Sequence, residues 1–228
     1  NVTAAINAKN IDELKEIIKK LSKIKENAEK VKNSATSKHY SAKATEAQAL
    51  ITDITKSIES AQKALDEAKQ SEQDRINTVK QALKNATQSL LAKKQELDGK
   101  TKYDEINLAV VTTNAELESA KNVLNLHNSV KNQGISALKT ELDNLTNAIS
   151  NTETSITTAE AKATAIKTRH ESLYKTFKDV DYKNAEALAK NTGTEIVKIN
   201  QAIQAYEKAL TKVSEIKTNA NNDGYTDL

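Results

Sequence analysis

The sequence lacks four residue types altogether: its 228 residues contain no cysteine, proline, methionine or tryptophan, and only four glycines. The absence of cysteine excludes a disulfide framework. The absence of proline removes the residue that most strongly breaks a helix interior, so very long helices are allowed. Aromatic residues make up only 3% of the chain, which is little for a compact globule, because such cores bury much aromatic surface. These absences favour long, thin helices that all lie close to solvent.

Neither sign of charge dominates, because 34 basic residues are balanced by 31 acidic ones and the formal net charge is +3. The two signs are interspersed, for example in residues 16–30, as is typical of solvated helix faces. Only Arg75 and Arg169 are arginine, whereas nucleic-acid-binding surfaces usually gather basic residues and use arginine on phosphates. The longest apolar run, Leu108–Val111, is far below the ~20 residues that span a bilayer. We therefore predict no nucleic-acid partner and no membrane-spanning segment.

What the sequence does contain is a sustained helical period. Between residues 135 and 173, apolar or small residues recur at alternating steps of three and four. This spacing is typical of the seam of a coiled coil or a long helical bundle. The inward positions that it predicts are Ile135, Leu138, Leu142, Leu145, Ile149, Thr152, Ile156, Ala159, Ala163, Ile166, His170 and Leu173.

The same period predicts four helices, at about 2–32, 42–98, 103–177 and 184–219, with loops at 33–41 and 178–183 and a turn at Gly99–Tyr103. Asn10 is a candidate cap that would make residues 1–9 a separate turn. Gly193 marks either a kink or the true start of the last helix, and the tail 219–228 is expected to fray. The predicted inward residues are Ile11, Leu14, Ile18, Leu21, Ile24, Ala28 and Val31 in the first helix; Ile51, Ile54, Ile58, Ala61, Leu65, Ala68, Ile76, Val79, Leu83, Ala86, Leu90 and Leu97 in the second; and Leu188, Ile196, Ile199, Ile203, Tyr206, Leu210, Val213 and Ile216 in the last.

Two phase shifts in this pattern, near Glu72 and near Lys131, suggest how the helices pair. If the chain folds back at Gly99–Tyr103, both shifts fall at one level of an antiparallel hairpin, so the second and third helices would pair along their whole length. The alternative is that Gly134 simply ends a helix. The fold class predicted is all-α: an elongated antiparallel helical bundle or coiled coil forming a single domain over 1–228. It has a four-helix body (1–70 and 135–220) and a two-helix arm (71–134). The whole particle is expected to be about 90–110 Å long, at 1.5 Å per helical residue.

The chain offers no constellation that suggests chemistry. His39 falls in a predicted loop, His127 and His170 fall on seam positions, and neither an HExxH nor a Glu-x-x-His motif occurs. Residues 219–224 faintly match the start of a calcium loop, but a polar linker is the simpler interpretation. We therefore predict a protein that is not an enzyme, with no catalytic, metal-binding or cofactor-binding residues.

Three segments share a diffuse pattern, in which a tyrosine is followed about twenty residues later by a small or aromatic residue and then a leucine. They are Tyr40 with Ala61 and Leu65, Tyr103 with Ala120 and Leu124, and Tyr182 with Tyr206 and Leu210. This pattern resembles the FIVAR-type helical modules of bacterial surface adhesins. The cysteine-free, helix-rich composition also resembles the glutamic acid/alanine-rich coat proteins of trypanosomes, and the Lys/Asn/Thr richness resembles mycoplasma adhesins of coiled-coil type. All three resemblances imply a non-enzymatic protein on a cell surface.

The function expected from these features is that of an extracellular surface protein, a coat antigen or adhesin that displays loops on a helical rod. Because the chain does not begin with methionine, we expect a processed form or segment, anchored by a lipid or wall signal outside it. Its partner would be a host protein or glycan receptor, met at His39–Tyr40, Gly99–Tyr103 or Asp179–Tyr182. One alternative is an intracellular coiled-coil scaffold, which should expose extra apolar residues for a partner helix. Outside the predicted stripes the sequence offers few apart from Leu91 and Val111. A second is a helical lipid-binding or pore-forming protein.

Overall fold

The computed structural model describes residues 2–227, and within them it contains helices and turns but no strand. The predicted all-α helical bundle is confirmed. The chain divides into two compact units, Asn1–Val79 and Lys80–Leu228. The long helix α3 (Ser41–Asp98) contributes residues to both. The predicted division into a body and an arm stays a prediction.

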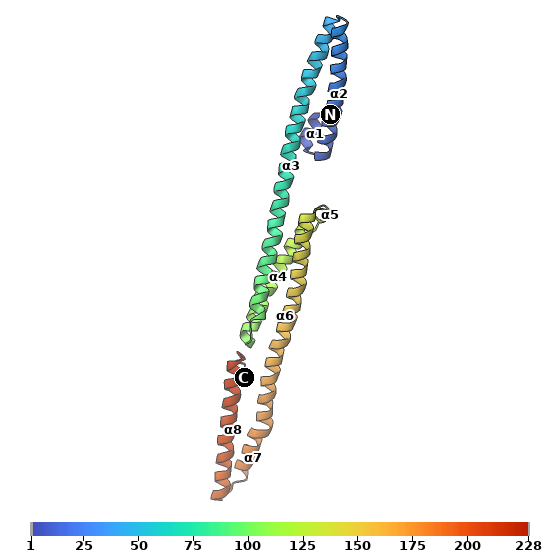
Figure 1. Ribbon diagram of the computed structural model, residues 1–228. Helices are drawn as coiled ribbons and strands as arrows, with labels where there is room; N and C mark the ends of the chain where they lie inside the picture. The colour runs from blue at the N-terminus through green and yellow to red at the C-terminus, as the bar shows by residue number, and fades with distance from the viewer. Residues whose placement is uncertain (1, 228) are drawn as a thin grey trace. The chain divides into compact units, whose positions relative to one another are not determined.

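The first unit is a helical hairpin with a short helix folded against it (Figure 1). Its elements are α1 (Val2–Ala8), α2 (Ile11–Ser37) and the first part of α3. The predicted cap is confirmed, because the Asn10 side chain accepts hydrogen bonds from the backbone N–H groups of Asp12 (3.1 Å) and Glu13 (3.3 Å). The core of this unit gathers Ala5, Leu14, Ala61, Ala64 and Leu65, with Val2, Ile6, Ile11, Ile17 and Ile18 packed against it.

The predicted loop at 33–41 is wrong for most of its length, because α2 continues to Ser37 and only residues 38–40 connect it to α3. Polar residues are accommodated in this last turn because the Thr36 and Ser37 hydroxyls donate to carbonyls of the preceding turn. The chain reverses at His39, whose φ of 59° lies in the left-handed region.

The second unit begins with three packed helices: residues 80–98 of α3, then α4 (Tyr103–His127) and α6 (Ser136–Thr176), with the one-turn α5 (Val130–Gln133) between the last two. A single helix over 103–177, and therefore its pairing with 42–98 along the whole length, is wrong. The chain leaves the helix after His127, and α6 returns along α4. The Asn132 side chain donates to the His127 carbonyl (2.8 Å), and the Ser129 hydroxyl caps the new turn. The alternative that a helix ends before Gly134 is the one the structure supports.

The seam predicted for α6 forms the centre of this bundle. Nine of its twelve positions are buried, Ile135 and Ile166 are half-buried, and only Leu173 is exposed. Facing side chains come from Leu83, Leu90 and Leu97 of α3 and from Ile106, Thr113, Leu117 and Ala120 of α4. The ion pairs Lys84–Glu141 (3.7 Å) and Lys121–Glu153 (3.1 Å) join the rims of neighbouring helices.

Beyond this bundle, α6 passes into a second hairpin. The predicted loop at 178–183 is wrong: Phe177–Tyr182 forms a π-helical turn, η1, which joins α6 directly to α7 (Lys183–Lys190). The chain turns at residues 191–195, where Gly193 has a φ of 50°. The last helix α8 (Ile196–Asn222) then runs back beside α7 and η1 (Figure 1). Gly193 thus lies before the helix and not within it, as one of the two sequence interpretations held.

Candidate interaction sites

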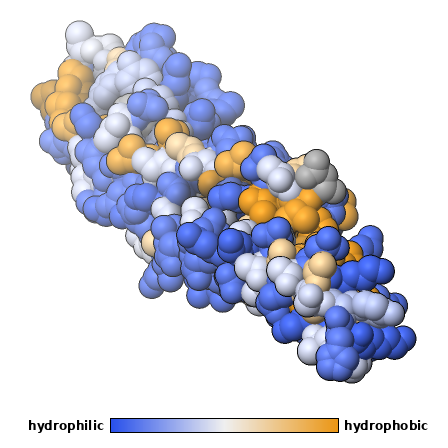
Figure 2. All heavy atoms as spheres, turned by 90° about the horizontal axis from the view of Figure 1, so that it is seen from above, coloured by the Kyte–Doolittle hydropathy of each residue, from blue (hydrophilic) through white to orange (hydrophobic). Residues whose placement is uncertain are grey.

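On the face that Figure 2 shows, exposed apolar groups form separate patches among mostly hydrophilic residues. Two open troughs between helices, one in each unit, are lined largely by apolar residues. Large exposed apolar patches on a monomer usually mark binding surfaces, so the two troughs are the candidate sites of this protein.

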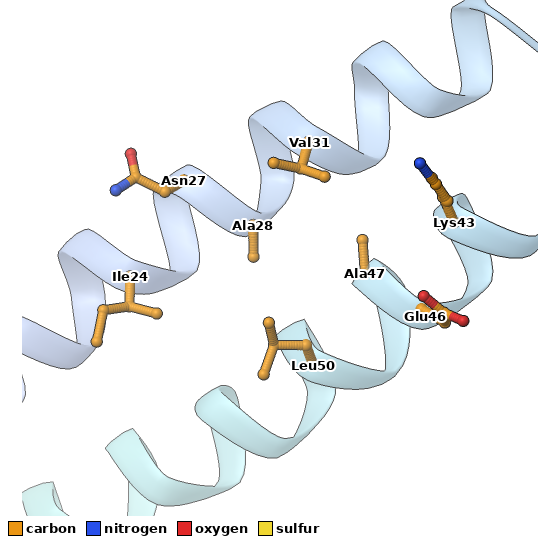
Figure 3. Close-up of a pocket in the computed structure, with 8 residues that line it drawn as sticks. All are labelled: Ile24, Asn27, Ala28, Val31, Lys43, Glu46, Ala47 and Leu50. Atoms are coloured by element: carbon orange, nitrogen blue, oxygen red, sulfur yellow. The ribbon is translucent and has the colours of Figure 1, made fainter. Parts of the chain in front are cut away.

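The first site, here called the α2–α3 groove, lies near the turn of the first hairpin (Figure 3). Its volume is about 440 Å³, and its lining comprises Ile24, Asn27, Ala28, Val31, Lys43, Glu46, Ala47 and Leu50. Ala28 and Ala47 are buried and bring the two helices close together, whereas Ile24, Val31 and Leu50 are about half exposed at 49%, 58% and 51%. The prediction that Ile24 and Val31 point inward is therefore wrong. The small alanines fill the contact between the helices and leave the larger side chains on its rim.

The adjoining turn carries one of the predicted display points. Tyr40 is 58% exposed, and the Lys43 ammonium lies 5.9 Å from the centre of its ring. His39 is exposed beside it. The tip of the first hairpin thus presents an aromatic ring, mixed charges and an apolar groove on neighbouring residues.

The second site, here called the α6–α8 trough, gathers aromatic side chains in the second unit. It has a volume of about 400 Å³, lined by Tyr174, Phe177, Lys178, Tyr182, Tyr206, Ala209, Leu210 and Val213. The chain has six tyrosines and one phenylalanine, so four of its seven aromatic rings lie here. The Tyr174 and Phe177 rings are 6.2 Å apart, and the Tyr182 and Tyr206 rings meet edge to face at 6.4 Å.

The π-helical turn η1 sets the geometry of this trough. Phe177, at its first position, is buried against Ala209, Ile216 and Val213 of α8. Asp179, on the outside of the turn, accepts hydrogen bonds from Lys175 (2.6 Å) and Lys183 (3.2 Å). These ammonium groups, Lys175 foremost, hold the pKa of the Asp179 carboxyl below its usual range. Short π-helical turns occur often at functional sites, and this one places an aromatic cluster on an exposed hairpin.

The predicted seam of α8 is an exposed stripe that begins outside the trough and ends in its lining, and it is here called the α8 stripe. Its members, at alternating steps of three and four, are Ile196 (74% exposed), Ile199 (37%), Ile203 (50%), Tyr206 (39%), Leu210 (67%) and the half-buried Val213. Of the residues predicted to point inward on α8, only Ile216 is buried, and Leu188, which is predicted to lie on the same helix but falls on α7, is 43% exposed. Instead, α8 contacts its neighbours through small residues, above all Ala202 and Ala209, which are 5% and 6% exposed.

A polar cluster holds the C-terminal segment to the bundle. The His170 Nε2 lies 2.7 Å from the Asp223 carboxylate, which also pairs with Arg169. The Asp223 carbonyl accepts the Tyr103 N–H (2.7 Å), and Tyr225 is only 3% exposed. The expected fraying of 219–228 is therefore wrong for the described residues. The segment that resembles a calcium loop ends helix α8, and Asp223 is engaged by side chains of α6.

The remaining histidine candidates and the predicted turn at Gly99–Tyr103 also lie in the second unit, except His39, which lies in the first. His170 is 1% exposed and occupies its predicted seam position, so solvent does not reach its ring. His127 is half-buried at the end of α4. The Gly99–Tyr103 turn, a predicted display point, is partly covered: the Lys100 carbonyl accepts from Lys162 (2.8 Å), and the Tyr103 ring packs edge to face on Tyr225.

Within residues 2–227, no group of three or more His, Cys, Asp or Glu side chains is placed to hold a metal ion. None of the described helices is long and apolar enough to cross a membrane. Comparison of the chain with models of protein families, with curated proteins and with solved structures found no match.

Sequence reasoning missed the α6–α8 trough, because Tyr174 and Phe177 were not singled out. One signal was available: four of the chain's few aromatic residues lie between positions 174 and 206. In a chain so poor in aromatics, such a concentration is itself a reason to look for a binding surface.

Proposed function

We propose that this protein is a non-enzymatic surface protein, a coat antigen or adhesin, which meets its partner at the tip of the first hairpin. The observation that supports the proposal is the α2–α3 groove, an open apolar surface beside the exposed Tyr40. Clustered apolar and tyrosine side chains with a polar rim are typical of surfaces that bind other proteins.

The chemistry of the groove favours a protein receptor over a glycan. Its apolar lining is aliphatic, from Ile24, Val31 and Leu50, and it contains no aromatic ring. Aliphatic rims around an alanine floor suit the apolar face of a helix or strand. Lys43 and Glu46 at the edge supply one charge of each sign, which would orient such a segment.

The cell-surface part of the proposal is tested with antibodies raised against the folded chain and applied to intact cells that make the full-length protein. We expect labelling without permeabilisation. Labelling that appears only after permeabilisation would contradict a surface location and would favour the intracellular scaffold.

The binding part is tested with Leu50→Glu, which places a charge in the groove. The matched control is Leu108→Glu, because Leu108 is also exposed (68%) but lies on α4 in the second unit. We expect Leu50→Glu to reduce binding of the labelled chain to receptor-bearing cells at least tenfold, since burying an unpaired charge is costly. Equal loss with both variants, or loss with neither, would refute the groove as the contact.

The scaffold remains a second candidate because one observation favours it. That hypothesis requires exposed apolar residues at helical spacing, and the α8 stripe has them, from Ile196 to Leu210. The antibody experiment separates the two locations, whereas the stripe alone is compatible with either. The lipid-binding alternative predicts that the chain floats with vesicles, and liposome flotation tests it.

A further inference from the structure

The α8 stripe and the trough beside it leave one side of the second hairpin without a packing partner. We infer that a second copy of this chain covers them, so that two hairpins close into an antiparallel four-helix bundle around a two-fold axis. This inference goes beyond the proposed function and does not depend on where the protein is located.

The spacing of the stripe is the first argument. Its six residues lie at alternating steps of three and four, from Ile196 to Val213, which is the pattern of a helix packed against another helix. An antiparallel copy sets Ile203 opposite the partner's Tyr206, and the same alignment covers the whole stripe. The pairs that complete it are Ile199 with the partner's Leu210 and Ile196 with the partner's Val213. A surface that maps onto itself in this way forms a closed two-fold contact.

Polar groups at the edge of the stripe favour the antiparallel direction. Asn200 and Glu207 follow the stripe residues Ile199 and Tyr206, and within the described part of the chain neither side chain has a polar partner. In the antiparallel alignment Glu207 lies beside the partner's Asn200, so the amide can donate to the carboxylate. In a parallel pair Glu207 would instead lie beside the partner's Ala202, which offers no side-chain donor. Antiparallel helix dipoles also attract one another.

The exposed area is large enough for a stable dimer. Five stripe residues, together with Tyr174 and Tyr182 of the trough, are each between 37% and 74% exposed. At about 200 Å² for a fully exposed large side chain, they present roughly 700 Å², close to the ~800 Å² per partner in a standard interface. No charged residue occupies any of the six stripe positions.

The extent of the surface argues against a small ligand as its occupant. The cavity of the trough is lined by Tyr206, Leu210 and Val213, whereas Ile196, Ile199 and Ile203 lie beyond it. A ligand that filled the cavity would leave those three isoleucines in water. A helix of about 18 residues, or ~27 Å at 1.5 Å per residue, would cover them all, and α8 itself carries such a face.

The first experiment measures mass against concentration by sedimentation or light scattering, with the intact chain. We expect a dimer in the micromolar range, about 100-fold weaker dimerisation in Ile203→Asp, and no change in the control Leu108→Asp. Circular dichroism verifies that both variants remain helical, as expected for substitutions at exposed positions. A monomer at every concentration, or a dimer that survives Ile203→Asp, would overturn the inference. So would a monomer that binds vesicles through the stripe.

The second experiment tests whether the two α8 helices run parallel or antiparallel. The chain has no cysteine of its own, so every disulfide formed joins the introduced residues. Ile199→Cys and Leu210→Cys are prepared separately and oxidised alone and as a mixture. We expect a covalent dimer only in the mixture, because residue 199 lies opposite residue 210 of the other copy. Efficient cross-linking of Ile199→Cys with itself would show a parallel pair and would refute the antiparallel bundle.

Discussion

Gly224 is the position where one added methyl group should release the C-terminal segment. Its φ of 73° lies in the left-handed region, and a Cβ placed there would be 2.0 Å from the Asp104 Oδ1 and 3.1 Å from the Lys102 Cβ. Gly193 has a similar φ of 50°, but a Cβ there would have no neighbour within 4 Å. The pair Gly224→Ala and Gly193→Ala therefore separates the cost of the backbone conformation from the cost of the clash.

The magnitude follows from what each substitution disturbs. In both variants the left-handed backbone conformation costs alanine about 1 kcal/mol relative to glycine. Gly224→Ala must also displace the Asp104 carboxylate, and its Cβ would still lie 3.1 Å from the Lys102 Cβ. Lifting the tail relieves both contacts, but it exposes the buried Tyr225 and breaks the bond from the Tyr103 N–H to the Asp223 carbonyl. Burial of one large side chain is worth about 2 kcal/mol, so we expect the docked tail to lose about 3 kcal/mol.

The assay is amide hydrogen exchange at Tyr103 and Tyr225, whose N–H groups bond to the Asp223 carbonyl (2.7 Å) and the Ala220 carbonyl (2.8 Å). A loss of 3 kcal/mol corresponds to about 100-fold faster exchange. Gly193→Ala should leave both amides unchanged, because it lies in a different turn. Unchanged exchange in Gly224→Ala, or equal acceleration in the two variants, would refute the reasoning that the tail is held by close packing around Gly224.

Further predictions concern the ionisation of Tyr225 in the same segment and the stability contributed by a buried and by an exposed seam residue. Burial, and then the Glu171 carboxylate that accepts its hydroxyl (3.0 Å), raise the pKa of Tyr225. Docking of the tail is therefore fully favourable below the ordinary tyrosine pKa of about 10 and weakens as the pH rises towards the raised value. An ultraviolet titration should show a late-titrating component that is lost in Tyr225→Phe, and a late component that persists in this variant would contradict the assignment to Tyr225. Leu145→Ala, at a position with 0% exposure, should lower the free energy of unfolding by about 2–5 kcal/mol in urea denaturation. Val31→Ala, at 58% exposure, should change it by less than about 0.5 kcal/mol, and similar losses would restore the prediction that Val31 points inward.

The helical period predicted the seams of α3 and α6 well because α3 packs on its apolar face in both units and α6 does so in the second. Ile51, Ile54 and Leu65 in the first unit and Leu83 and Leu90 in the second are all buried as the spacing predicts. In these helices one stripe of large residues meets neighbours on both sides, so the spacing and the burial coincide.

The reversal between α4 and α6 could not be predicted from the period alone. A phase shift of the seam near residue 131 is compatible with a continuous helix or with a turn. The deciding contacts are local and polar: the Asn132 amide on the His127 carbonyl and the Ser129 cap. Such side-chain bonds compete with the helix, but asparagine and serine are frequent throughout this chain, so their positions alone do not predict where a helix stops.

The docked tail was missed for a different reason. Asp223 and Tyr225 are held by His170, Glu171 and Tyr103, which are far from them in the sequence. The polar composition of the segment predicts fraying when only its own residues are considered. Its order results from one aromatic ring and one carboxylate that reach partners on α6 and α4, and no local pattern encodes such contacts.

The exposed stripes have a common physical origin, which links the fold to the inferred function. In both hairpins the helices touch through alanines, Ala28 and Ala47 in the first unit and Ala202 and Ala209 in the second. An alanine buries little apolar area, and at about 25 cal/mol per Å² it stabilises the contact much less than a leucine would. Each hairpin therefore leaves several large apolar side chains on the rim, where they remain available to a partner. A partner that binds there also stabilises the hairpin by mass action, so binding and folding of these ends are coupled.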